Sequence, residues 1–218
     1  YLAAQQVELR EHWEYDTIQR SEVKRHLNEY FYYGGLPEIL SFKNKRAMLS
    51  SLYQKIYLGD ICARNNIKND RVLNILIKKM AESVKQPLSY NRLRNVIVAT
   101  GSPISVPTTI DYVDYAADSW LILPMENEIG KLTEKEMQKK YYFVDNGLLN
   151  LFLMNSETSL LENMVAVELC RRYGKKNVFF LNAEKEIDFV VPDEKLAIQV
   201  SYSIKNEITY NREVLPLV

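Results

Sequence analysis

Residues 159–202, SLLENMVAVELCRRYGKKNVFFLNAEKEIDFVVPDEKLAIQVSY, decide the fold class of this chain. Apolar residues recur at helical spacing up to about Tyr173, and three strand-like runs rich in β-branched and aromatic residues follow. The runs cover residues 178–181, 187–191 and 196–202. Another helix is expected to begin within residues 206–218. A helix followed by strands predicts an α/β sandwich, which we expect to occupy residues 156–218.

The residues before this segment predict helices. The helical region is expected to span residues 1–85, with apolar positions at helical spacing from Val23 onward, and the first helix is expected to end at Gly34-Gly35. The expected N-caps of three successive helices are Ser21, Asn44 and Asp70. Residues 1–20 are polar and weakly patterned, and we expect a frayed helix there that packs on a preceding domain.

Residues 86–155 predict a winged helix. Ser89 and Ser105 are suitable N-caps for two short helices separated by a tight turn. Two strand-like stretches follow at 120–125 and 141–144, with a polar, charged loop between them. Asp145 is then expected to cap a short helix, and Ser159 to open the longer one. The whole chain is therefore expected to be α+β: a helical region, a winged helix-turn-helix and an α/β domain.

The composition indicates a soluble, cytoplasmic protein. The 218 residues are 47% hydrophobic with a formal net charge of zero, and no run approaches the roughly 18 apolar residues that span a bilayer. Residues 1–20 are polar and mixed in charge, so we do not expect a signal peptide there. Cys62 and Cys170 lie far apart and are expected to be buried thiols in a reducing compartment. Because the first residue is Tyr1 rather than Met, we expect the chain to be part of a longer protein.

Charge is unevenly distributed around the expected helix-turn-helix. Residues 61–94 hold eight basic and two acidic side chains, whereas residues 101–128 hold five acidic and no basic ones. The candidate DNA-contacting residues are Arg92, Arg94, Thr108 and Thr109. The second helix also carries three aspartates, which phosphates would repel, so an architectural winged helix is favoured over one that binds the DNA groove.

Four polar residues of the C-terminal segment form the candidate metal site. They are Glu162, Asp188, Gln199 and Ser201. Asp188 lies on an apolar strand, where a carboxylate is costly unless it is paired or binds a metal. Oxygen ligands from Glu162 and Asp188 would suit Mg²⁺, and such a metal could activate water against a phosphodiester. The alternative is structural, because Ser159-x-x-Glu162 also matches a capping box.

A series of motifs resembles a known family. In chain order they are Tyr30-Phe31-x-x-Gly34-Gly35-Leu36-Pro37-Glu38, Gly59-Asp60-Ile61-x-x-Arg64, Ser105-x-x-Thr108-Thr109-Ile110, Tyr142-Phe143-x-Asp145-x-Gly147-Leu148, Leu161-Glu162-Asn163-x-Val165, Glu186-Ile187-Asp188-Phe189-Val190-Val191 and Ile198-Gln199-Val200. Their order resembles the region after the P-loop core in bacterial and archaeal AAA/STAND-type ATPases that carry a C-terminal domain of unknown function. The chain itself has no P-loop sequence, so the ATPase core would be a further part of the same protein.

The resemblance implies roles for several residues. Gly35 and Pro37 would match a lid motif close to the nucleotide, so ATP and Mg²⁺ are expected only in the full-length parent. The C-terminal domain would have the restriction-endonuclease-like PD-(D/E)XK fold, with Asp188 as its metal-binding residue and Glu162 as its helix glutamate. Gln199 would replace the second acidic residue, and Ser201 the superfamily lysine.

These departures predict a nuclease fold without nuclease activity. Lys195 or Lys205 could substitute for the absent lysine, although no sequence pattern indicates it. We expect a regulatory or partner-binding module with an unidentified protein partner and no membrane contact. One alternative is a metal-dependent nuclease coupled to an ATPase, and a second is a winged-helix regulator that binds DNA.

Overall fold

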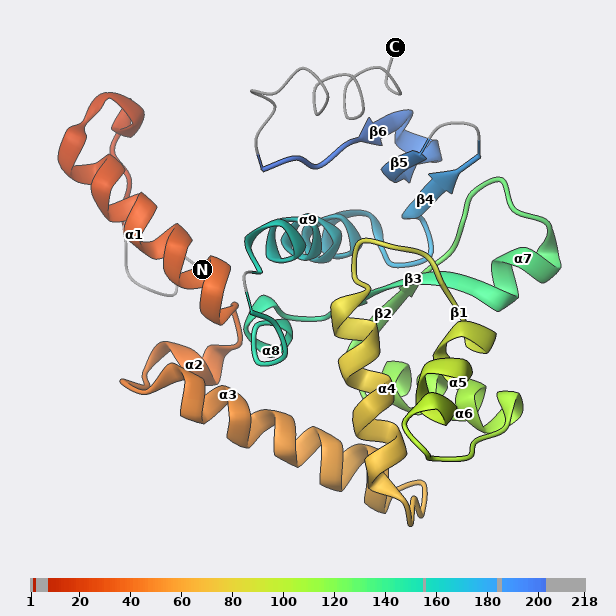
Figure 1. Cartoon of the computed structure of the whole chain (residues 1–218). Helices are drawn as coiled ribbons and strands as arrows, with labels where there is room; N and C mark the ends of the chain where they lie inside the picture. The colour runs from red at the N-terminus through yellow and green to blue at the C-terminus, as the bar shows by residue number, and fades with distance from the viewer. Residues whose placement is uncertain (1, 3–7, 155, 184–185, 203–218) are drawn as a thin grey trace.

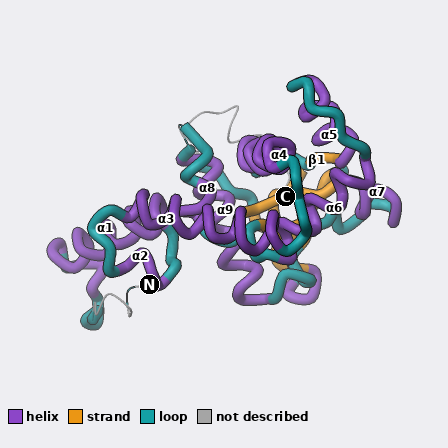
Figure 2. The backbone as a smooth tube through the Cα atoms, turned by 90° about the horizontal axis from the view of Figure 1, so that it is seen from below, coloured by secondary structure: helices purple, strands orange, loops and turns teal. Residues whose placement is uncertain are grey.

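The computed structural model describes residues 2, 8–154, 156–183 and 186–202 (Figure 1). The described chain is a mixed α+β protein with two small antiparallel sheets, which confirms the predicted class. Figure 2 shows the strands near the centre with the N-terminal helices extending to one side. Within the described residues, no helix has the length and apolar character needed to cross a membrane.

The N-terminal part is helical, as expected. Its elements are η2 (Trp13–Tyr15), α1 (Thr17–Tyr33), α2 (Pro37–Leu40), α3 (Lys45–Gln54), η3 (Lys55–Ala63) and α4 (Asp70–Glu82). The helix over η3 has π geometry, although its apolar spacing predicted a continuing α-helix. Helix α4 buries one whole apolar face, and its core residues are Val72, Leu73, Leu76, Ile77 and Met80.

The middle part alternates short helices and strands. Its elements are β1 (Leu88–Ser89), α5 (Tyr90–Ala99), α6 (Val106–Asp118), β2 (Ile122–Met125), α7 (Leu132–Met137) and β3 (Gln138–Phe143). The strands form a sheet in the order β1-β3-β2. The segment expected to be a loop between β2 and β3 contains α7, and β3 begins three residues before the predicted strand.

The C-terminal part is a helix followed by a sheet. Its elements are α8 (Asn146–Leu149), α9 (Glu157–Tyr173), β4 (Phe179–Asn182), β5 (Glu186–Val191), η4 (Pro192–Glu194) and β6 (Leu196–Ile198). The strands are antiparallel in the order β4-β5-β6, and α9 lies between this sheet and α8 (Figure 1). The helix expected in 206–218 and the side chain of Lys205 lie outside the described residues.

A short backbone bridge joins the two sheets. The amide of Phe180 on β4 donates to the carbonyl of Glu126 at 3.0 Å, and Glu128 donates back to Phe180 at 2.9 Å. The side chain of Asn127, between these two residues, pairs with the backbone of Asn182. Because β2 precedes this bridge and pairs with β3, the bridge positions β3 beside β5.

Three predictions of helix starts were wrong. Helix α1 begins at Thr17 rather than after Ser21, because the Asp16 carboxylate accepts from the amides of Ile18 and Gln19. Asp70 is the first residue of α4 and not its N-cap, which is Asn69. Helix α9 begins at Glu157, so Ser159 lies inside it and the capping box does not form.

Candidate functional site

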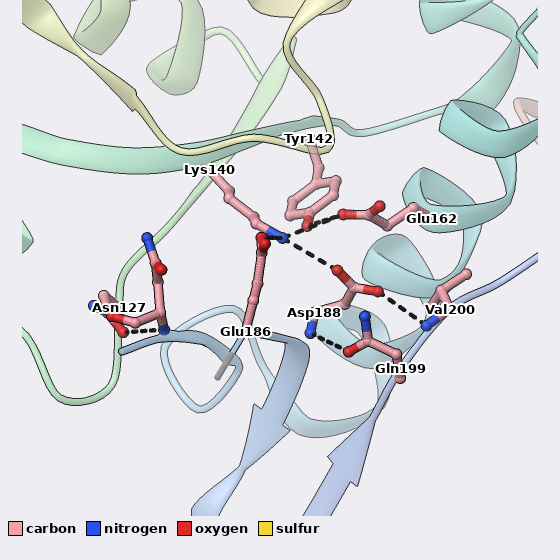
Figure 3. A network of polar contacts seen from close by, with 9 residues as sticks. Asn127, Lys140, Tyr142, Glu162, Glu186, Asp188, Gln199 and Val200 are labelled. Carbon is pink, nitrogen blue, oxygen red and sulfur yellow. Dashed lines mark hydrogen bonds and ion pairs between the residues drawn. The ribbon is translucent and has the colours of Figure 1, made fainter. Parts of the chain in front are cut away.

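The candidate site is a buried cluster of charged groups between α9, β3 and β5 (Figure 3). At its centre lies the ammonium group of Lys140 on β3, a residue that sequence reasoning did not select. Lys140 Nζ is 3.3 Å from Asp188 Oδ1, 3.5 Å from Glu162 Oε1 and 3.4 Å from Glu186 Oε1. Lys140 is completely buried, so its charge is stable only because carboxylates surround it.

Strand alternation explains how β3 supplies two members of the cluster. Lys140 and Tyr142 are two residues apart, so their side chains project from the same face. The Tyr142 hydroxyl donates to Glu162 Oε1 at 2.8 Å. Glu162 is turned toward β3 because Asn163, the next residue of α9, pairs with both backbone groups of Phe143.

The two carboxylates predicted to bind metal are therefore brought together, but around an ammonium group. Asp188 Oδ1 faces Lys140, and its Oδ2 accepts from the amide of Val200 at 2.9 Å. The Gln199 side-chain oxygen accepts from the amide of Asp188 at 3.1 Å. Within the described ranges, no group of three or more His, Cys, Asp or Glu side chains is arranged to hold a metal ion.

Burial and charge set the protonation of this cluster. Burial raises the pKa of Glu162 to about 7, although the Lys140 ammonium opposes this effect. Burial alone would lower the pKa of Lys140, but the carboxylates of Glu162, Asp188 and Glu186 outweigh it and raise that pKa. Burial and the nearby Glu162 also raise the pKa of Tyr142 well above its ordinary value. The lysine is therefore charged and the tyrosine neutral near pH 7.

Gln199 and Ser201 fall within the strand-like run predicted over residues 196–202, but the structure places neither of them on a strand. Strand β6 ends at Ile198, so both residues lie in the irregular segment that follows it. The side chain of Gln199 accepts from the backbone amide of Asp188, as described above. Ser201 is half-buried. The position at which the resemblance expected a lysine thus lacks one, while Lys140 approaches Asp188 from the other sheet.

The Gly34-Gly35 turn faces a carboxylate of its own chain. Gly35 donates its amide to Asp145 Oδ2 at 2.7 Å, and a Cβ on Gly34 would lie 1.9 Å from Asp145 Oδ1. Pro37 occupies the first turn of α2, where its ring is tolerated. Gly34 is therefore required by packing against Asp145, whereas a Cβ on Gly35 would lie 2.6 Å from the Tyr30 ring.

The candidate DNA-contacting residues are unevenly accessible. Arg92 is exposed, whereas Arg94 is half-buried and donates to the carbonyl of Ile104. Thr109 is completely buried and donates to the carbonyl of Ser105. The Ser105 hydroxyl caps the start of α6 by accepting from the amide of Thr108, and the Thr108 hydroxyl lies 2.8 Å from it. The exposed face of α6 carries the acidic side chains of Asp111, Asp114 and Asp118. This arrangement favours an architectural role for the helix pair.

Comparison with known proteins finds relatives for most of the chain. An uncharacterized protein of Methanocaldococcus jannaschii, MJ1544, is 30% identical over 209 residues, which cover 92% of this chain and 47% of that protein. An uncharacterized protein of Haemophilus influenzae is 30% identical over 185 residues, which cover 81% of this chain and 46% of that protein. The chain thus spans about half the length of the curated relatives it matches. No solved structure matches it.

A family description also matches residues 24–159. The matched segment contains Lys140, Tyr142 and Asp145 and ends within α9, before Glu162 and Asp188. Since this segment is more than half of the 218 residues, the chain belongs to the family described as a domain of unknown function, DUF8612.

Proposed function

We propose that this chain is a non-catalytic regulatory or partner-binding module of an AAA/STAND-type P-loop ATPase. In this proposal a lid-like helical region is followed by a winged helix and by a PD-(D/E)XK-like fold that has lost nuclease activity. The observation that carries the proposal is the position of the Lys140 ammonium group between Glu162 and Asp188.

A nuclease of this type needs carboxylate oxygens that are free to bind a hydrated divalent ion. Here both oxygens of Asp188 have a partner, Lys140 on one side and Val200 on the other. A metal ion would have to displace or closely approach a buried ammonium group, and like charges at such a distance repel strongly in a buried site. The carboxylates therefore serve to hold β3, β5 and α9 together.

The order of elements in the middle part supports the winged-helix assignment. Helix α4, strand β1, helices α5 and α6, and the β2–β3 hairpin follow one another, and the sheet order is β1-β3-β2. Because three aspartates cover the exposed face of α6, we assign this unit to protein contacts and not to DNA.

Two observations support a link to an ATPase core. The relatives are about twice as long as the segment they share with this chain, which leaves space in them for another domain. Asp145 also ties the Gly34-Gly35 turn, the proposed lid motif, to the start of α8. A nucleotide-dependent movement of the lid would thereby reach the C-terminal part through a hydrogen-bonded contact.

The test is a calorimetric titration with Mn²⁺, together with a cleavage assay on single- and double-stranded DNA. We expect neither saturable Mn²⁺ binding nor metal-dependent cleavage by the wild-type chain. Asp188→Asn and Glu162→Gln are the matched variants, since each removes one carboxylate charge at nearly constant volume. Cleavage that requires Mn²⁺ and disappears in both variants would overturn the proposal.

A second candidate function is a metal-dependent nuclease that uses Lys140 as its lysine. The observation in its favour is the 3.3 Å distance between Lys140 Nζ and Asp188 Oδ1, since the superfamily lysine also lies beside the metal-binding carboxylate. This candidate predicts DNA cleavage that is lost in Lys140→Met and retained in Lys139→Met. The same assay therefore separates the two functions.

A further inference from the structure

A cavity lies away from the charged cluster, among the N-terminal helices. It has a volume of about 420 Å³ and is bounded by α3, η3, α4 and the segment that follows α8. Ligand pockets commonly enclose roughly 300–1,000 Å³, so a small molecule fits it. All of its lining residues fall within the segment that the DUF8612 family matches.

The charge of this cavity is positive. Arg46 from α3 and Lys78 from α4 line it, and none of the other lining residues is acidic. Among the described residues, the ion pairs of these two helices are made by Lys45 and Lys79, not by Arg46 or Lys78. The Arg46 guanidinium lies 3.5 Å from the carbonyl of Asn150, which is its single polar contact within the described part of the chain. Two side chains are thus free to bind an anion.

Aromatic rings form one wall of the cavity. Tyr53 and Phe152 pack edge to face with ring centroids 5.0 Å apart, and Tyr57 lies 5.5 Å from Tyr53. The Tyr53 hydroxyl is buried and has no hydrogen-bond partner among the described residues. Tyr57 belongs to η3, whose π geometry is rare and recurs at functional sites. Unsatisfied buried hydroxyls are few in folded proteins, and this one, on Tyr53, belongs to a residue in the wall of the cavity.

From these features we propose that the cavity is a binding site for a small anion with a planar aromatic ring, of the size and chemistry of a nucleoside monophosphate. Its ring packs against Tyr53 and Phe152, and its phosphate is held by Arg46 and Lys78. Asn74, which also lines the cavity, supplies an amide for polar atoms of the ring. This site is separate from the Glu162–Asp188 cluster and does not depend on the proposed function.

The test uses AMP as the probe, with calorimetry for affinity and amide NMR shifts for location. We expect saturable AMP binding with a Kd below about 1 mM. The shifts should concentrate at Tyr53, Asn74 and Phe152. Adenosine, which lacks the anion, and inorganic phosphate, which lacks the ring, should each bind at least about tenfold more weakly, since each retains only one of the two contacts.

Point variants separate this site from general attraction of anions. Arg46→Met and Lys78→Met should each weaken AMP binding about tenfold or more, because a charge-assisted hydrogen bond is lost. Lys55→Met is the matched control, since Lys55 is exposed on η3 and does not line the cavity. Absence of saturable binding, equal binding of inorganic phosphate, shifts located elsewhere, or an equal loss in Lys55→Met would each overturn the proposal.

Discussion

The Asp145 carboxylate accepts a hydrogen bond from the backbone amide of Gly35 at 2.7 Å, across 110 positions of sequence. The same carboxylate caps α8 through the amide of Gly147 at 2.8 Å. Burial raises the pKa of Asp145, and the amides of Gly35 and Gly147 oppose this effect by stabilising the charged form. One side chain therefore joins the end of α1 to the start of α8.

This contact predicts that Gly34→Ala is strongly destabilising. The new Cβ would lie 1.9 Å from Asp145 Oδ1, and Gly34 has a φ of 78°, which favours glycine. We expect the free energy of unfolding to fall by about 3 kcal/mol or more, measured by urea denaturation. Gly101→Ala is the control, because Gly101 has a φ of 80° but open space around its Cβ position, so only about 1 kcal/mol of backbone strain is expected. Equal losses in both variants would contradict the clash with Asp145.

The buried charge of Lys140 leads to a second prediction. Lys140→Met leaves Glu162 and Asp188 close together without their cation, so we expect a loss of about 3–5 kcal/mol in unfolding free energy at pH 8. Lys139→Met should cost no more than about 1 kcal/mol, since the side chains of its partners Glu126 and Glu136 are 40% and 61% exposed and both charges stay in contact with water. Denaturant titration of the two variants under one set of conditions makes the comparison. A Lys140→Met protein as stable as Lys139→Met would show that the cluster does not stabilise the fold.

Local signals predicted much of the fold. Asn44, Ser89, Ser105 and Asp145 cap the helices that their positions indicated, because each is a short polar side chain directly before an apolar helical pattern. The start of α1 was misplaced because Asp16 precedes a polar segment whose apolar pattern is weak. The π geometry of η3 has no counterpart in residue spacing.

Only part of the charged cluster could be predicted. Glu162 and Asp188 stand out as acids within apolar segments, whereas Lys140 lies in the polar half of β3, which the predicted strand over 141–144 did not include. The sequence does contain one indication that Lys140 belongs to the cluster. Lys140 precedes Tyr142 by two residues, so on a strand the two side chains project from the same face. This indication applies only if the strand begins before Lys140, and β3 begins at Gln138 rather than at the predicted residue 141. The bridge through Asn127 that places β3 beside β5 depends on tertiary structure.

The start of α9 allows a direct test of whether Ser159 and Glu162 form a capping box. Ser159 lies inside the helix, so Ser159→Ala should change stability by no more than about 0.5 kcal/mol. Ser105→Ala removes the hydroxyl that accepts from the amide of Thr108, and should cost about 1 kcal/mol. Thermal unfolding of both variants distinguishes a true cap from a serine within a helix. A larger loss of stability in Ser159→Ala than in Ser105→Ala would show that Ser159 does cap the helix.

The raised pKa of Glu162 predicts how stability depends on pH. Its pKa is about 7 in the folded chain against an ordinary value of 4.5, so between these two pH values the folded state holds more protons than the unfolded state. Unfolding free energy then decreases as pH rises from about 4.5 to 7, and the contribution of this one group is up to about 3 kcal/mol. The stabilising contribution is complete below the unfolded pKa and is lost as pH passes the folded pKa.

Glu162→Gln should therefore flatten the stability profile between pH 5 and 7.5, measured by urea denaturation at half-unit steps. Gln keeps the shape of a protonated Glu but cannot ionise, so the variant should gain most relative to wild type above pH 7. Glu168→Gln is the control on the same helix, where the carboxylate pairs at the surface with Arg171 and Arg172, which lower its pKa. That variant should leave the slope over this range unchanged. If Glu162→Gln instead keeps the wild-type slope, Glu162 is ionised throughout and the Lys140 ammonium outweighs its burial.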